Sequence, residues 1–576
     1  MKDQIPIPSV ARRLDSIATA IAIIIRTASK GSFLSIVILT FSVLLAGQGW
    51  AATTRWVNDN DPNGGLYMPP GTSCNDPGYP TIQSAINAAV AGDTIIVCDG
   101  TYLELAAGPL TINKTLTLMG AQSGVDARSR VGAESIVTDP QGTFITANNV
   151  VIDGFTFQDS FVAAFTGFGI AMGAGTTGTR ILNNIIQDNI VGIALANTGV
   201  SPVLIRHNLI RSNNRPGGAS GTGIYTDEFV GGPVVTDVLI EENAFIGHID
   251  AGIDVSNTDP LGGAFNLDVS RNSFDMNGRA AVLFNTHMSS IHDNRIANNT
   301  LPVSAAIRIF DNNSQLSIMN NDLVNGVAHA IRLSFLGLVG GASSGVVINQ
   351  NNIGVAGSAS FALTGLTVDP LSHVGPVNAE CNWWGSSTGP TELINNPGGT
   401  GEEVVGDADY TPWLITPAPG GPCLGGLPST SGKVTGGGQI EDPVFSPNGD
   451  LLSLPGILVS TSGGAQANFG FVIQFESGDP APKGNLVYND HDAGVRIKAT
   501  SFDTLVIGAG VCGLNTHATF TGTAEVNGVS ESLIVEVDDC GEPSSGPPPD
   551  TFRITTDTYS NSGALISGNI QIHKSP

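Results

Sequence analysis

A six-residue pattern of the form apolar-x-x-Asn-x-apolar recurs between residues 150 and 384 and constrains the fold more than any other feature. Successive copies are 22 to 35 residues apart. A repeat of this length indicates stacked supersecondary units, because one such unit cannot bury its apolar face alone. The asparagines of the pattern are Asn184, Asn208, Asn243, Asn272, Asn294, Asn321, Asn351 and Asn382, and an earlier related copy has Phe155 at this position.

Each repeat has the composition of β-strands joined by turns. Runs of β-branched residues alternate with Gly, Asn and Asp, which tolerate left-handed backbone angles. An asparagine that recurs once per coil can hydrogen-bond to its counterparts above and below, because its amide both donates and accepts. A second strand follows in most repeats, at 192–197, 223–228, 252–257, 281–286, 306–311 and 330–335. We therefore predict two strands per coil and a ladder of asparagines.

These residues resemble the right-handed parallel β-helix repeats of the pectate-lyase-like superfamily, over roughly residues 53–415. The resemblance implies an all-β solenoid. In the entry region, residues 53–148, the segment TIQSAINAAVAGD has the apolar spacing of a helix and resembles the N-terminal capping helix of this superfamily. Residues 376–415 resemble the closing segment of secreted bacterial β-helix proteins.

Residues 1–51 have the features of an export signal. Basic residues precede the apolar run 33–46, and the small residues near Gly49 and Ala51 suit a signal peptidase. The run of about 14 residues is short for a membrane span. A second apolar run at 18–25 leaves an uncleaved anchor as the alternative. We expect the protein to be secreted, extracellular or at the cell surface.

The charge of the chain excludes one class of partner. The formal net charge is −26, and it is −29 without residues 1–51. Such a surface repels nucleic acids and anionic lipids, so we expect neither a nucleic-acid partner nor a membrane contact beyond the signal segment. A polyanion would bind tightly only through a bridging cation such as Ca²⁺.

The last quarter of the chain changes character. Residues 416–432 are rich in Pro, Gly and Ser and predict a linker. Residues 433–576 contain alternating strands without the asparagine period, and we predict a small β-sandwich. This segment resembles the post-COAP type of C-terminal domain, which implies no activity. The six cysteines form three pairs that are close in sequence, so the expected disulfides are Cys74–Cys98, Cys381–Cys423 and Cys512–Cys540.

Alignment of the second strands predicts one polar outer face. The third position of each strand gives the column Ala194, Tyr225, Asp254, Leu283, Arg308 and Arg332. Two residues further on, the column is Ala196, Asp227, Ser256, Asn285, Phe310 and Ser334. Alternation places both columns outside. The candidate catalytic residues are Asp227, Asp254 and Arg308, and the candidate substrate-binding residues are Tyr225, Glu228, His287, Asp311 and Arg332.

An acidic pair beside arginines and aromatic rings is what a sugar-binding groove or a weak Ca²⁺ site needs. The alternative is a solvated face on which Asp and Arg pair across coils, with little effect on stability. Enzymes of the superfamily use this outer face, the lyases with acidic Ca²⁺ ligands and a basic residue, and the hydrolases with grouped Asp residues. Neither set of motifs is recognisable in this sequence.

The other polar and aromatic clusters predict packing and turns. His248, His292 and His329 fall at unrelated positions of their coils, so no metal site is predicted. The run Asp490-His491-Asp492 predicts a turn between strands. For Trp383, Trp384 and Trp413 we favour packing against the last coil over exposed sugar platforms.

We therefore predict a non-catalytic protein, secreted or at the cell surface, that binds carbohydrate or a surface glycan or is structural. Adhesion through the C-terminal domain is compatible with this role. The alternative is a polysaccharide lyase, glycoside hydrolase or epimerase that uses the predicted face. The prediction requires no cofactor, and Ca²⁺ is the candidate if there is one. The sequence sets neither the glycan nor the oligomeric state.

Overall fold

A computed structural model describes most of the chain. The described residues are 52–60, 64–104, 108–162, 167–199, 201–355, 360–419, 421, 423–425, 430–441, 466–476, 479, 481–491, 493–510, 512–541 and 548–574. The predicted export signal at 1–51 lies outside them. Within the described residues, no helix has the length and apolar character needed to cross a membrane.

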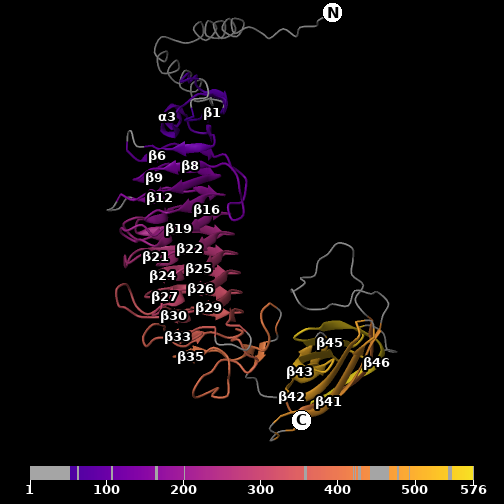
Figure 1. Cartoon of the computed structure of the whole chain (residues 1–576). Helices are drawn as coiled ribbons and strands as arrows, with labels where there is room; N and C mark the ends of the chain where they lie inside the picture. The colour runs from indigo at the N-terminus through magenta and orange to yellow at the C-terminus, as the bar shows by residue number, and fades with distance from the viewer. Residues whose placement is uncertain are drawn as a thin grey trace, which may run out of the picture.

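The first part of the chain is a solenoid of parallel strands (Figure 1). Its described strands form three sheets, which we call the first, second and third sheets, with 13, 10 and 11 strands. The first sheet consists of β1 (Thr54–Val57), β4 (Thr94–Val97), β7 (Thr117–Met119), β10 (Val151–Asp153), β13 (Arg180–Leu182), β16 (Val203–Arg206), β19 (Val234–Glu241), β22 (Gly263–Ser270), β25 (Thr286–His292), β28 (Ser314–Met319), β31 (Val347–Asn349), β34 (Val377–Asn378) and β36 (Ala408–Asp409). The second sheet consists of β5 (Gly100–Tyr102), β8 (Ser135–Thr138), β11 (Phe155–Gln158), β14 (Ile185–Gln187), β17 (Leu209–Arg211), β20 (Ala244–Ile246), β23 (Ser273–Asp275), β26 (Arg295–Asn299), β29 (Asp322–Gly326) and β32 (Asn352–Ile353). The third sheet consists of β6 (Leu110–Ile112), β9 (Gly142–Ile145), β12 (Phe168–Met172), β15 (Val191–Ala194), β18 (Thr222–Thr226), β21 (Ala251–Ser256), β24 (Arg279–Phe284), β27 (Ala305–Ile309), β30 (His329–Leu333), β33 (Leu366–Val368) and β35 (Val404–Val405).

A complete coil contributes one strand to each sheet, so the predicted two strands per coil are wrong. The asparagine pattern spans two strands, because its first apolar residue lies on the first sheet and its last on the second. In ILNNII, for example, β13 ends at Leu182 and β14 begins at Ile185. The residue before each asparagine has a left-handed φ, as at Asn183 (52°) and His207 (57°). The turn is so short that the apolar residues on either side of it keep the spacing expected of one continuous strand. The two strands were therefore predicted as one.

The eight repeat asparagines form one buried column in these turns. The Nδ2 atom of each donates to Oδ1 of the next, at 2.9 to 3.3 Å, from Asn184 to Asn382. The same Oδ1 accepts the backbone N–H of the preceding asparagine at 2.8 to 3.0 Å. Phe155 N–H donates to Asn184 Oδ1 and so occupies the first rung without an amide. The column therefore satisfies turn groups that no strand could pair.

A second buried column lies five residues further along, between the second and third sheets. Asn189 Nδ2 donates to Asn213 Oδ1 (2.9 Å), and Asn213 Nδ2 lies 3.2 Å from His248 Nε2. His248 Nδ1 lies 2.9 Å from Asn277 Oδ1. Because Asn213 donates and Asn277 accepts, the ring of His248 is neutral and carries its proton on Nδ1. Sequence analysis missed this column, although its members follow the first ladder at a constant spacing.

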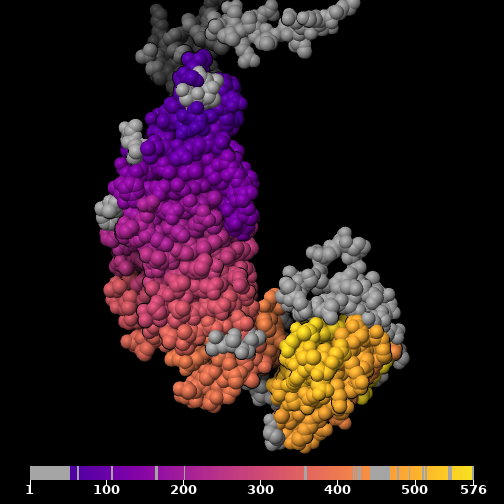
Figure 2. All heavy atoms as spheres, in the orientation of Figure 1, coloured from indigo at the N-terminus to yellow at the C-terminus, as the bar shows by residue number. Residues whose placement is uncertain are grey.

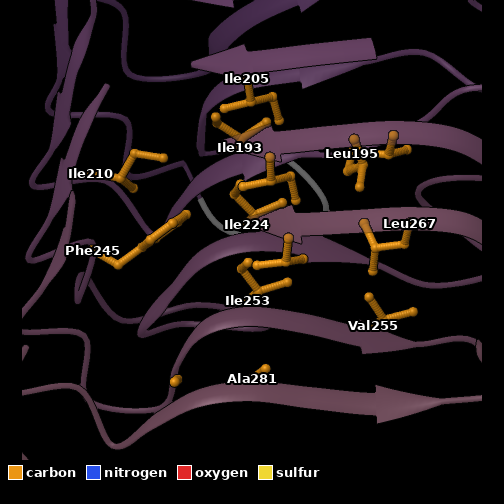
Figure 3. Packing of buried hydrophobic residues seen from close by; sticks show 14 of the residues in the cluster. Ile193, Leu195, Ile205, Ile210, Ile224, Phe245, Ile253, Val255, Leu267 and Ala281 are labelled. Carbon is orange, nitrogen blue, oxygen red and sulfur yellow. The ribbon is translucent and has the colours of Figure 1, made fainter. Parts of the chain in front are cut away.

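Apolar side chains fill the solenoid between the three sheets. Ile193, Ile224 and Ile253 stack on neighbouring strands of the third sheet (Figure 3). Phe245 and Phe274 stack on the second sheet, with ring centroids 4.7 Å apart. The stacks belong to one buried cluster that extends along the solenoid. Figure 2 shows the resulting elongated body and, beside it, the rounded body formed by the carboxyl-terminal residues.

The helix α3 (Ile82–Ala88) lies where the sequence predicted one, at the start of the solenoid (Figure 1). Thr81 caps it, and its Oγ1 accepts the Ser84 N–H at 3.1 Å. The helix contacts β1, β4 and β6 and is followed by the first complete coil. The antiparallel pair β2 (Gly71–Ser73) and β3 (Asp76–Pro77) lies beside β1, and the disulfide Cys74–Cys98 ties it to the end of β4. These elements cover a strand edge that would otherwise be open.

At the other end, β37 (Trp413–Leu414) and β38 (Cys423–Gly425) pair antiparallel. The disulfide Cys381–Cys423 joins this pair to the last coil, and a third disulfide joins Cys512 to Cys540, so the pairs are those expected from the sequence. The tryptophans predicted to pack rather than to face solvent, Trp383, Trp384 and Trp413, are all buried.

The carboxyl-terminal residues form a closed antiparallel barrel, so the predicted β-sandwich is wrong. Its described strands are β39 (Gly432–Glu441), β40 (Gln466–Phe475), β41 (Lys483–Asp490), β42 (Val495–Gly510), β43 (Gly513–Val526), β44 (Val529–Asp538), β45 (Thr551–Thr556) and β46 (Ser560–Lys574). Closure comes from β39, which pairs with both β40 and β46. A sandwich and a barrel have the same alternation of apolar and polar residues, so the sequence pattern could not distinguish them.

We expect Asn272→Ala to lower the free energy of unfolding by about 2 to 4 kcal/mol, because each buried group left without a partner is costly. The Asn272 side chain accepts the N–H and Nδ2 of Asn243 and donates to the Ile240 carbonyl and to Asn294 Oδ1. Asn299→Ala is the control, because the Asn299 amide is buried without a hydrogen bond to any described residue. Urea unfolding of both variants measures the difference, and equal losses would contradict the role of the ladder.

We also expect acid to destabilise the solenoid through His248. Burial lowers the pKa of His248 from 6.5 to about 4, so the unfolded chain takes up the proton first as the pH falls. The stability contributed by this residue is complete above pH 6.5, is lost as the pH falls towards 4, and amounts to about 3 kcal/mol. His248→Asn restores an asparagine at this rung and should lose less stability than the wild type between neutral pH and the folded pKa. The free energy of unfolding of both proteins is measured with urea at neutral pH and near the folded pKa. If the wild type and His248→Asn lose the same amount between these two pH values, His248 is not responsible.

Candidate functional site

The outer face of the third sheet brings most of the predicted site residues together. One residue of each successive strand lies in register there, about 4.8 Å from the next. This central column consists of Ala194, Tyr225, Asp254, Val282, Arg308, Arg332 and Thr367. Asp254 and Arg308 are therefore two strands apart, and Arg332 lies directly beside Arg308.

The predicted column was one residue out of register at β24. Val282 pairs with Asp254 and Arg308, whereas Leu283 points into the solenoid core. For the same reason Phe284, and not Asn285, lies opposite Ser256. In β15, β18, β21, β27 and β30 the second and third residues are Gly-Ile or Ala-Ile. In β24 they are Ala280-Ala281, whose small side chains do not mark which residue faces inward.

The acidic end of the face contains Asp254, Asp227 and Tyr225. The Tyr225 hydroxyl donates to Asp227 Oδ2 at 2.8 Å, and Asp227 Oδ1 accepts the N–H groups of Phe229 and Val230. Asp227 is therefore committed to a turn and to Tyr225. Of the two carboxylates, Asp254 therefore has fewer hydrogen-bond partners.

Asp254 is only 8% exposed, and it accepts a hydrogen bond from the Ser256 hydroxyl. Burial raises the pKa of Asp254 to about 6. The Ser256 hydrogen bond and the charge of Arg279 oppose the shift, and Asp250 and Asp227 add to it. A carboxyl group with this pKa exchanges its proton near neutral pH.

The basic end of the face is centred on Arg308. Arg279 forms an ion pair with Asp250 (2.7 Å), and Arg332 forms one with Asp369 (2.9 Å). By contrast, Nη1 of Arg308 is buried and has no hydrogen-bond partner in the part of the chain that the structure describes. Burial lowers the pKa of Arg308 to about 10, with Arg332 contributing in the same direction. The side chain is therefore still charged at neutral pH, and no described carboxylate pairs with it.

Aromatic rings support this guanidinium. The Arg308 Cζ atom lies 4.8 Å from the centroid of the Phe310 ring, and Phe310 stacks on Phe284 with centroids 4.4 Å apart. Val282, Phe284 and Val339 form a small buried cluster outside the main core, with Phe310 packed against it. The face therefore combines apolar ring surface with a charge above it.

Three predicted binding residues lie elsewhere or are buried. The Glu228 carboxylate accepts the N–H and the hydroxyl of Thr258 at 2.9 and 2.7 Å, which joins two coils. His287 lies on β25 of the first sheet, where it stacks on Phe265. Asp311 is fully buried and accepts backbone N–H groups. The sequence placed these residues near the face because they follow its strands, but the turn after each strand directs them away.

The structure adds residues that sequence reasoning missed. Arg279 begins β24, and His329 begins β30 on the same face, with Nδ1 2.7 Å from Thr364 Oγ1. Burial and the two arginines Arg308 and Arg332 lower the pKa of His329. A correct alignment of β24 would have pointed to Arg279. Asp369 joins the face through its ion pair with Arg332, which the sequence does not indicate.

Neither a metal site nor a site in the barrel follows from the described residues. They contain no group of three His, Cys, Asp or Glu side chains that could hold a metal ion, and Ca²⁺ stays a prediction. Asp490 is buried in the barrel, where it accepts the Tyr559 hydroxyl and the Ala493 N–H, as in a turn. Asp492 lies outside the described residues, and His491 lies 3.2 Å from Asn468.

Comparison with known proteins assigns no family. No protein-family model matches the chain, and no curated protein matches it, so the resemblance of the carboxyl-terminal segment to the post-COAP type stays a prediction. Among solved structures, pectate lyase Pel9A is similar at 16% identity and a TM-score of 0.31, over 56% of this chain and 80% of that one. The A-module of the mannuronan C-5 epimerase AlgE6 of Azotobacter vinelandii has 14% identity and a TM-score of 0.30, over 58% of this chain and 96% of that one. Tailspike protein 2 of bacteriophage CBA120, in its enzymatically active domain, has 13% identity and a TM-score of 0.29, over 86% of this chain and 73% of that one. These similarities give this chain neither a substrate nor a residue role.

Proposed function

We propose that this protein is secreted or held at the cell surface and binds a polysaccharide, without cleaving it, along the outer face of the third sheet. The observation that carries the proposal is the charged guanidinium of Arg308, which lies over the ring of Phe310 and has no described partner at Nη1. A partly buried charge whose buried nitrogen has no partner is unfavourable, so an acidic group of a ligand would stabilise it.

Location outside the cell is supported by the cysteines. All six are paired in disulfides, including one at each end of the solenoid and one in the barrel region. Such bonds form and persist in oxidising compartments. The export signal expected at 1–51 fits the same location.

The geometry of the face suits a long repeating ligand. Equivalent positions recur at intervals of about 4.8 Å along the solenoid, which offers a linear chain a series of similar contacts. Tyr225 and Asp254 supply hydrogen-bonding groups at one end, and Phe310 and Arg308 supply ring surface and charge at the other. Sugars need this combination, because they carry both apolar C–H faces and hydroxyl groups.

The charges also indicate how acidic the polysaccharide is. The chain as a whole carries a net charge of −26 and repels a densely charged polyanion. Arg279 and Arg332 already have carboxylate partners, which leaves Arg308 for a ligand. A polysaccharide with isolated acidic groups among neutral sugars therefore fits better than one in which every sugar is charged.

The second candidate function is catalysis on the same face, and Asp254 is the residue that favours it. Its carboxyl group is buried, has a pKa of about 6 and lies two strands from Arg308. A group with this pKa can act as a general acid or base near neutral pH. In that case Asp254 would exchange the proton, and Arg308 would hold an acidic group of the substrate.

We expect Arg308→Gln to weaken binding to hyaluronan, which has one carboxylate per disaccharide, by about tenfold or more, because a charge-assisted hydrogen bond is lost. Calorimetric titration at low and high salt measures the change. Arg211→Gln is the matched control, since Arg211 lies on the outer face of the second sheet and donates to Gln187. Neutral dextran and polygalacturonate should bind more weakly than hyaluronan. No binding to any of the three, or equal effects of both variants, would refute the proposal.

We expect no cleavage of these polysaccharides by the wild-type protein, measured as new reducing ends and as absorbance of unsaturated products. Asp275→Asn is the control, because Asp275 lies on β23 of the second sheet. Cleavage that is lost in Asp254→Asn and kept in Asp275→Asn would establish the second candidate function instead. If Asp254 acts as a base, the rate would rise with pH and reach half its maximum near the pKa of about 6.

A further inference from the structure

A loop beside Arg308 is held in place by a fully buried carboxylate. Asp311 follows β27, and its side chain has no exposed surface. Its Oδ1 accepts the Leu336 N–H at 2.7 Å, and its Oδ2 accepts the Leu338 N–H at 2.7 Å and the Val339 N–H at 3.4 Å. These donors belong to residues 335–341, which follow β30 and which we call the 335–341 loop. The loop therefore folds back from its own coil onto the coil of Arg308.

Backbone contacts fix the far end of the loop on the same coil. Asn312 N–H donates to the Gly341 carbonyl at 2.9 Å. Gly340 has a φ of 54°, and a Cβ atom there would lie 2.5 Å from Cγ of Asn312. Glycine at this position therefore lets the loop approach the Asn312 side chain closely.

The loop ends in a packing contact that reaches Arg308. Val339 belongs to the same small buried cluster as Phe284, and Phe284 stacks on Phe310 with ring centroids 4.4 Å apart. Phe310 in turn lies beneath the Arg308 guanidinium at 4.8 Å. A chain of contacts thus leads from the carboxylate of Asp311, through the loop and two rings, to the unpaired cation.

We propose that Asp311 is a positioning residue for the ligand site. Its hydrogen bonds to the N–H groups of the 335–341 loop, which we call the latch, keep Val339 packed in the cluster with the two phenylalanine rings. The rings in turn keep Arg308 in the orientation that receives an acidic group. Asp311 cannot touch a ligand itself, because it is buried and its oxygens are occupied. This inference rests on the proposed function, since it assumes that Arg308 binds the ligand.

The same latch shapes the edge of the face. The side chains of Leu336 and Leu338 leave these residues 51% and 63% exposed, although their backbone N–H groups donate to Asp311 and the next residue, Val339, is buried. Exposed leucines held rigidly beside a polar face form an apolar wall, which can contact the C–H face of a sugar. The loop thus supplies both the support for Arg308 and a boundary of the site.

The test is a double-mutant cycle on binding to hyaluronan. Asp311→Asn replaces one acceptor oxygen by an NH₂ group that faces a backbone N–H, so the latch opens. We expect this variant to weaken binding about threefold to tenfold, and we expect no further loss when Asp311→Asn is added to Arg308→Gln. A general loss of structure would instead weaken both backgrounds equally, so additivity overturns the inference, as does an unchanged affinity.

Two further variants make the result decisive. Asp259→Asn is the matched control, because Asp259 Oδ1 accepts the Leu261 N–H in another loop of the same edge and has no described contact with Arg308. It should leave the affinity unchanged. Val339→Ala keeps the latch but removes the packing contact, and it should reproduce the non-additive loss even if Asp311→Asn fails to fold. If Arg308→Gln alone leaves binding unchanged, the proposed function falls with the inference. If Arg308→Gln weakens binding but Val339→Ala and Asp311→Asn do not, the inference alone is wrong.

Discussion

Buried amide hydrogen bonds in the turns hold the coils in register, and the rest of the solenoid depends on them. At each corner between the first and second sheets the backbone turns sharply within two residues, which leaves polar groups that no neighbouring strand can pair. The ladder from Asn184 to Asn382 satisfies these groups with one side chain per coil. The second column does the same at the next corner, where His248, in its neutral form, takes the place of an asparagine. A shift of one residue in any of the four coils that carry both columns would break two columns at once.

This fixed register also aligns the residues of the candidate site. Because each strand is held against its neighbours residue by residue, outward side chains from different repeats form straight columns. Tyr225, Asp254 and Arg308 come from three repeats that are far apart in sequence, yet they lie in one column of the third sheet. The solenoid thus acts as a rigid support on which chemistry can change without altering the core. Loops such as 335–341 then fold over the edge of the column.

Charge gives this face its character. The chain is strongly acidic, and most of the described arginines on the face are neutralised by an aspartate. Arg308 differs because it is supported by rings instead of by a carboxylate. Asp254 differs in the opposite sense, because burial favours its protonated form. The proposed binding function rests on the unpaired cation, and the second candidate, proton transfer, rests on the partly protonated acid two strands away.

The sequence by itself determined the repeat, its parallel β-helix form and the asparagine positions, because a buried polar residue once per coil leaves a periodic signal. It also indicated the capping helix and the polar strands of the third sheet. Tertiary structure decided the number of strands per coil, the closure of the barrel and the site. The number of strands per coil was hidden because two short strands around a left-handed residue have the same apolar spacing as one long strand. Closure of the barrel was hidden because it depends on pairing between β39 and β46, which are distant in sequence. At the site, Asp311 was predicted to bind ligand but is buried beneath a loop. Arg332 pairs with Asp369, whereas no described carboxylate pairs with Arg308. Such roles depend on which neighbour a side chain meets across coils, and that information exists only once the chain has folded.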